Sequence, residues 1–210
     1  MLDLTKLPQL QTFPMQEVIE GLARAKKTVT TFYGDSHSTQ HNGDADNRWV
    51  DKDQWRWYNA LKHGAQVEGF NVNLNYTTGS HWWAKNHLPG WIPTDNMQHF
   101  AALQQWLVNS KIFHHTGRQL FFIQLAGQGS PIHTDFDPMK VPEHLRAPSD
   151  FIWLTPPDRP KTLTVDGVVA PWCCWFNHFK PHGSQPEIEP KWSVRIDGVF
   201  SDSFRREYLR

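Results

Sequence analysis

Short apolar segments separated by turn-forming residues make up the second half of the chain, and this pattern limits the folds open to it. The segments are rich in β-branched and aromatic residues, which favour strands, and turn clusters such as "PPDRP" separate them. We expect strands at 118–126, 151–155, 161–165, 171–177 and 192–198. Short strands at a spacing of roughly ten residues indicate an antiparallel sandwich or a barrel-like jelly roll.

The first half of the chain is a mixture of helix and loop. Apolar residues recur at helical spacing, and this predicts helices at 15–27, 53–64 and 94–111, with a polar loop at 34–47. Alternating apolar residues and asparagines predict a strand at 69–79. We therefore expect a mostly β protein with N-terminal helices, in which 1–210 form a single domain. Residues 1–117 would be the helical and mixed portion, and 118–210 the core.

The charge and composition argue against several classes of partner. The chain has 21 basic and 21 acidic residues, so nothing electrostatic favours nucleic acid or an anionic membrane. Asp3 and Pro8 lie where a signal peptide would need an unbroken apolar core, and no apolar run approaches the length of a membrane span. The adjacent Cys173 and Cys174 are poorly placed for a disulfide, which favours a reducing compartment. We expect a cytoplasmic protein that acts on a small molecule, an amino acid or a peptide.

The stretch "SPIHTDFDP" at 130–138 contains a candidate half-site for a metal. His133 and Asp135 follow an expected strand and a glycine-rich turn, and in an extended chain their side chains point the same way. The chain has 12 histidines, however, and chance alone gives about one His-x-Asp triplet. By itself the triplet is equally consistent with an exposed turn in which Asp135 caps the next segment.

The wider context makes a metal site a stronger hypothesis. Another histidine, His178 or His182, follows a later expected strand, and Arg195 lies inside the next one. Two imidazoles and one carboxylate on one face of a metal are used by non-haem Fe(II) oxygenases, because they leave positions open for cosubstrate and oxygen. An arginine in the same barrel can pair with a carboxylate of such a cosubstrate.

The order and spacing of His133, Asp135, His182 and Arg195 resemble the motif of the iron and 2-oxoglutarate dependent dioxygenase superfamily. The core of that superfamily is a double-stranded β-helix, or jelly roll. The run from Phe176 onward resembles the closing strands of its aspartyl/asparaginyl β-hydroxylase-like branch. The resemblance spans about 118–205. It implies an enzyme that uses Fe(II), 2-oxoglutarate and O2, hydroxylates its substrate, and releases succinate and CO2.

The resemblance also assigns roles to individual residues. His133, Asp135 and His182 would be the metal ligands; the spacing to Arg195 favours His182, and His178 stays as the alternative. Arg195, Ser193 and Gln124 would bind the cosubstrate. Two alternatives stay open, namely a structural pair between Arg195 and Asp197, and a surface position for Gln124. Arg118 is expected to be solvated.

Two other functions remain possible at this point. One is a cupin-like metalloenzyme that does not use 2-oxoglutarate. The other is a non-catalytic jelly-roll binding module in which the triplet has no metal. The tryptophan-rich segment 80–93 and the strand residues Asn71, Asn73 and Asn75 could line a cleft, but loop tryptophans more often cover the edge of a core.

Overall fold

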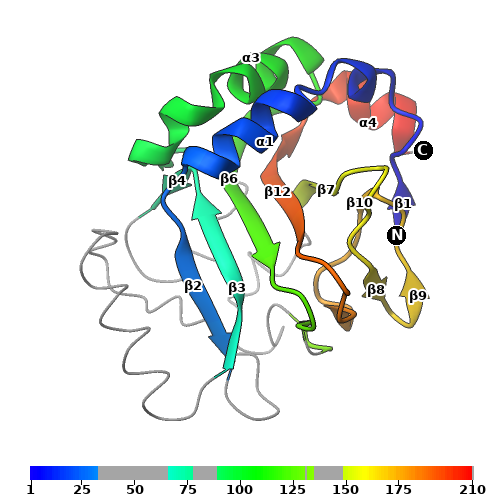
Figure 1. Cartoon of the computed structure of the whole chain (residues 1–210). Helices are drawn as coiled ribbons and strands as arrows, with labels where there is room; N and C mark the ends of the chain where they lie inside the picture. The colour runs from blue at the N-terminus through cyan, green and yellow to red at the C-terminus, as the bar shows by residue number, and fades with distance from the viewer. Residues whose placement is uncertain (33–65, 78–88, 131, 135–148, 210) are drawn as a thin grey trace.

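Two antiparallel sheets and a layer of helices make up the computed structural model, which describes residues 1–32, 66–77, 89–130, 132–134 and 149–209 (Figure 1). The larger sheet has seven strands and the smaller sheet three. In the order of the larger sheet, the strands are β1 (Leu2–Asp3), β10 (Cys173–Trp175), β7 (Asp150–Leu154), β12 (Lys191–Phe200), β6 (Phe113–Gln124), β3 (Gln66–Asn73) and β2 (Thr28–Phe32). The smaller sheet is formed by β11 (His182–Ser184), β8 (Leu163–Val165) and β9 (Val168–Val169). A separate short pair joins β4 (Asn75–Tyr76) to β5 (Ile92–Pro93).

From β6 onward the chain alternates between the two sheets. It leaves β6 in the larger sheet, bridges to β11 at His133, and returns through β7. It then enters the smaller sheet as β8 and β9, crosses back as β10, and repeats the exchange with β11 and β12. This alternation defines a jelly roll, or double-stranded β-helix. The fold class predicted from the strand pattern is therefore confirmed.

The helices lie along one side of the larger sheet (Figure 1). They are η1 (Pro8–Thr12) and η3 (Asp95–Phe100), both 3₁₀, and the α-helices α1 (Met15–Arg24), α3 (Ala101–Ser110) and α4 (Asp202–Tyr208). Val18 of α1 and Leu103 of α3 share a buried apolar cluster with Phe121 of β6 and Ile196 of β12. A second cluster, centred on Phe151, lies between the larger sheet and β8.

The predicted elements of the first half are shorter or more divided in the structure. The helix expected at 15–27 ends at Arg24, because the chain becomes extended to enter β2. The helix expected at 94–111 is a 3₁₀ turn followed by α3. The helix expected at 53–64 and the loop at 34–47 lie outside the described residues. The N-terminal portion also supplies β1, β2 and β3, which extend the larger sheet.

The two cysteines are buried and free, and they point into different apolar clusters. Cys173 belongs to the cluster under the helices and Cys174 to the cluster around Phe151, since neighbours in a strand face opposite ways. Burial raises the pKa of both thiols, that of Cys174 to about 12. Both therefore remain protonated and unreactive at neutral pH.

No helix in the described part of the chain has both the length and the apolar character needed to cross a membrane.

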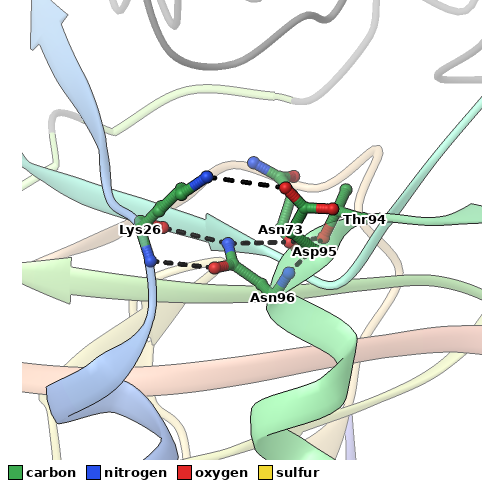
Figure 2. A network of polar contacts seen from close by, with 5 residues as sticks. All are labelled: Lys26, Asn73, Thr94, Asp95 and Asn96. Atoms are coloured by element: carbon green, nitrogen blue, oxygen red, sulfur yellow. Dashed lines mark hydrogen bonds and ion pairs between the residues drawn. The ribbon is translucent and has the colours of Figure 1, made fainter.

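Asn96 joins three segments at the start of η3 (Figure 2). Its side-chain oxygen accepts a hydrogen bond from the Lys26 backbone N–H at 2.8 Å, and its amide nitrogen donates to the Lys26 carbonyl at 3.0 Å. The same nitrogen lies 3.3 Å from the carbonyl oxygen of Asn73, at the end of β3. The Thr94 hydroxyl donates to that carbonyl at 2.8 Å and accepts from the Asn96 N–H. Asn96 is buried, so these bonds fix the chain between α1 and β2 against the end of β3.

Replacing Asn96 by alanine is expected to lower the free energy of unfolding by about 1–3 kcal/mol, because it removes the partner of the partly buried backbone groups of Lys26. Urea denaturation of both proteins measures the difference. Asn109→Ala removes an amide from the exposed side of α3 and should change stability by less than about 0.5 kcal/mol. Equal effects of the two substitutions would contradict this role for Asn96.

Candidate metal and cosubstrate site

His133 and His182 lie side by side although they are far apart in the sequence. The backbone N–H of each donates to the carbonyl of the other, both at 2.8 Å, which forms an antiparallel bridge. Directly opposed residues in such a pair project their side chains to the same side. The two ring centroids are 4.6 Å apart, with His182 buried and His133 half-buried. The fold thus brings together two of the three predicted metal ligands.

The ring of His182 is held in one tautomer. Its Nδ1 lies 2.8 Å from the carbonyl oxygen of Lys180. A carbonyl can only accept, so Nδ1 carries a proton, and in the neutral ring Nε2 has the lone pair that a metal would need. The ring of Phe176 packs against the imidazole at a centroid distance of 5.1 Å. Orientation and tautomer are therefore both set by the protein.

A turn at Asn177 places the Lys180 carbonyl under this ring. The side-chain oxygen of Asn177 accepts from the Phe179 N–H at 3.0 Å, and its backbone carbonyl accepts from the Lys180 N–H at 2.9 Å. Asparagine favours such turns because its side chain bonds the backbone two residues ahead. Phe176 and Asn177 thus have different functions, since Phe176 packs against His182 and Asn177 turns the chain toward it.

His178 lies in different surroundings. It is 2% exposed, and its ring packs against Phe179 at 4.7 Å and Phe151 at 6.0 Å between centroids. Its position is therefore among aromatic side chains, whereas His182 carries the bridge to His133. The choice of His182 as the distal ligand is consistent with this arrangement and stays a prediction.

Asp135, the third predicted ligand, lies outside the described residues. Among the residues that are described, no group of three or more His, Cys, Asp or Glu is arranged to hold a metal ion. The described part of the site is therefore the histidine pair.

Arg195 lies in the middle of β12, between Leu120 of β6 and Trp153 of β7. It points away from the helices, because its neighbours Val194 and Ile196 belong to the cluster on the helical side. The guanidinium carbon lies 4.1 Å from the centroid of the Phe151 ring. Alternation along β12 therefore places Arg195 on the face of the sheet opposite the helices.

Arg195 makes the structural pair that the sequence left open as an alternative. Its Nε and Nη2 both lie 3.0 Å from Oδ1 of Asp197, which is fully buried. Ser193 is also buried, two residues earlier on the same face. Their predicted contacts with a cosubstrate stay predictions.

The expectation that Arg118 is solvated is wrong. Arg118 is 9% exposed, and its Nε donates to Oδ2 of Asp197 at 3.2 Å. The strand begins earlier than expected, at Phe113, so Arg118 lies within β6 and not at its exposed start. The buried carboxylate of Asp197 favours the burial of Arg118, because a buried carboxylate without a cationic partner would be costly.

Gln124 is fully buried, so the alternative of a surface position is also wrong. Its amide nitrogen donates to the carbonyls of Gln128 and Gln185, the latter at 2.8 Å. Its oxygen accepts from the Ser184 hydroxyl at 2.6 Å. These bonds tie the end of β6 to β11 and explain its burial without a cosubstrate. Its predicted contact with 2-oxoglutarate stays a prediction.

Lys161 is a buried cation that the sequence did not reveal. It is 6% exposed, and its Nζ lies 4.0 Å from the ring centroid of Phe122, which pairs with Ser193 across β6 and β12. Its backbone N–H donates to the Thr155 hydroxyl at 3.0 Å. A lysine that follows the turn "PPDRP" has the signature of a solvated residue, so no sequence signal could have placed it here.

Asn75, one of the three asparagines considered for a cleft, has a structural role. The side chain of Asn75 donates to the Gly117 carbonyl at 2.8 Å and accepts from the Gln119 N–H at 2.9 Å. It therefore continues the hydrogen bonding of β6 beyond the end of β3. Residues 80–88 of the tryptophan-rich segment lie outside the described residues.

No protein-family model and no curated protein matches the chain. Among solved structures, the chain is similar to an oxidoreductase of the 2OG-Fe(II) oxygenase family from Burkholderia pseudomallei, with a TM-score of 0.46 and 9% sequence identity. The match covers 87% of this chain and 77% of that one.

Proposed function

We propose that this protein is an Fe(II)- and 2-oxoglutarate-dependent oxygenase that hydroxylates a small molecule, an amino acid or a peptide. The observation that carries the proposal is the pairing of His133 with His182 between strands of a jelly roll, with Arg195 on the strand that follows. The order of these residues along the chain matches the motif of that superfamily.

The proposed metal-binding side chains suit Fe(II). His133 and His182 would hold the ion, with Asp135 as the proposed third ligand. Neutral imidazole is a suitable ligand for Fe(II), and the hydrogen bond from His182 Nδ1 to the Lys180 carbonyl keeps that ring in the required form. Iron, when bound, supplies the activation of O2 on which the conversion of 2-oxoglutarate to succinate and CO2 depends.

The protein's own residues would bind and orient the reactants. Arg195 is proposed to pair with the distal carboxylate of 2-oxoglutarate, with Ser193 as a hydrogen-bond donor beside it. Phe151 packs against Arg195, and Phe176 packs against His182. The two phenylalanine rings also contact each other, with their centroids 5.0 Å apart. Such apolar groups help to exclude water from a reactive centre.

One observation favours a second candidate, a cupin-like metalloenzyme that does not use 2-oxoglutarate. Arg195 already has a buried carboxylate partner in Asp197, so its burial needs no ligand. The histidine pair would serve such an enzyme equally well. The two candidates differ in whether metal-dependent activity requires the keto acid.

The test compares wild type with Arg195→Ala in an assay that follows 2-oxoglutarate to succinate with Fe(II) and ascorbate. We expect turnover by wild type and a KM for 2-oxoglutarate at least about tenfold higher in the variant, because a charge-assisted pair is lost. Arg159→Ala removes an exposed arginine that pairs with Glu189 and should leave KM unchanged. Metal binding without any dependence on 2-oxoglutarate would favour the cupin-like enzyme. Absence of metal binding by wild type would favour a binding module.

A further inference from the structure

We infer that Asp197 and Arg118 are positioning residues that fix Arg195 for the distal carboxylate of a dicarboxylic 2-oxo acid. The inference rests on the proposed function and adds to it a device for choosing between cosubstrates. Its basis is the buried group formed by Arg118, Arg195 and Asp197, hereafter the Arg-Asp-Arg group.

Asp197 contacts both arginines, one with each carboxylate oxygen. Oδ1 accepts from Nε of Arg195 at 3.0 Å and forms an ion pair with its Nη2 at the same distance, and Oδ2 accepts from Nε of Arg118 at 3.2 Å. The carboxylate has no exposure to solvent, so water does not weaken these electrostatic interactions. The Nε edge of Arg195 is therefore held toward Asp197, and rotation at the end of its side chain is restricted.

Phe151 adds a second, independent constraint on Arg195. The guanidinium carbon lies 4.1 Å from the ring centroid, a distance at which cation–π attraction keeps the cation over the ring. Asp197 binds the Nε edge of the Arg195 guanidinium, and Phe151 holds the guanidinium over the face of its own ring. A cation held in this way loses little further entropy when it binds a carboxylate, which favours binding.

Arg118 completes the group by meeting the other oxygen of Asp197. Each oxygen of this buried carboxylate therefore meets one arginine. If Arg118 were lost, only the oxygen that faces Arg195 would keep its partner within the group, and Asp197 would orient Arg195 less firmly. The group therefore favours a keto acid with a second carboxylate over one without.

The experiment measures dissociation constants by calorimetry for the Mn(II)-loaded full chain with two ligands. One is 2-oxoglutarate, and the other is 2-oxobutyrate, which has the keto-acid end but no distal carboxylate. Asp197→Asn is expected to raise Kd for 2-oxoglutarate about tenfold and to leave Kd for 2-oxobutyrate within about twofold. In turnover assays KM for 2-oxoglutarate should rise while kcat stays within about twofold.

A second pair of variants covers the case in which Asp197→Asn fails to fold. Arg118→Gln should weaken binding of 2-oxoglutarate selectively, whereas Arg118→Lys, which keeps the charge, should restore most of the affinity. Glu189→Gln alters an exposed ion pair and serves as the matched control. Equal weakening of both ligands, or none, would overturn the inference while leaving the oxygenase proposal intact. If wild type binds Mn(II) but not 2-oxoglutarate, both are overturned.

Discussion

Replacing His182 by alanine is expected to weaken metal binding by at least about a hundredfold and to abolish 2-oxoglutarate turnover. Loss of a group that only supports a metal ligand already costs 10- to 100-fold, and His182 is a proposed ligand itself. The measurements are Mn(II) binding by calorimetry and succinate formation with Fe(II). His133→Ala should have the same effect, because the two rings form one pair.

His178→Ala is the matched control. Its ring packs among Phe151 and Phe179, so its removal should lower stability but leave the affinity for Mn(II) within about threefold. If His178→Ala lost the metal and His182→Ala retained it, the assignment of the distal ligand would be reversed. If all three histidine variants bound metal as wild type does, the site would lie elsewhere.

Replacing Phe121 by alanine is expected to lower the free energy of unfolding by about 3–5 kcal/mol. Phe121 is fully buried at the centre of the larger sheet, where it stacks on Phe100 at 4.9 Å and meets the edge of Trp192 at 5.8 Å. The substitution leaves a cavity between the sheet and the helices. For a chain of this size the melting temperature should fall by roughly 10 °C, measurable by calorimetry or circular dichroism.

Val108→Ala provides the comparison for Phe121. Val108 lies on α3 and is 73% exposed, so its truncation should change stability by no more than about 0.5 kcal/mol. A loss below about 1 kcal/mol for Phe121→Ala would mean that the layer between the helices and the larger sheet contributes far less than its burial indicates.

The sequence predicted the strands that carry an apolar pattern and missed those that do not. β6, β7 and β12 were expected because β-branched and aromatic residues recur along them. β11 has only three residues, "HGS", with no apolar alternation, and becomes a strand through pairing with β8. The helix α4 did carry a signal, since Ser201 caps it by accepting from the Phe204 N–H.

The sequence could suggest the candidate residues that follow the order of a known motif. It could not predict the residues whose position depends on burial in the folded protein. His133, His182 and Arg195 could be proposed together because their order and spacing match a known motif. The positions of Arg118 and Lys161 could not, because each is drawn inward by a partner on another strand or by a ring that the sequence does not place nearby. Asp197 was visible as a neighbour of Arg195, but its second arginine was not.

The place of β12 in the larger sheet has a consequence for how this protein is made in the cell. β12 inserts between β6 and β7, pairing Phe113 with Phe200 and Gln124 with Lys191. During synthesis both neighbouring strands therefore emerge with one edge open, and these edges stay open until the ribosome has released the segment through Phe200. Open strand edges are the usual starting points of aggregation. The nascent chain is thus most prone to aggregate just before β12 becomes available to pair.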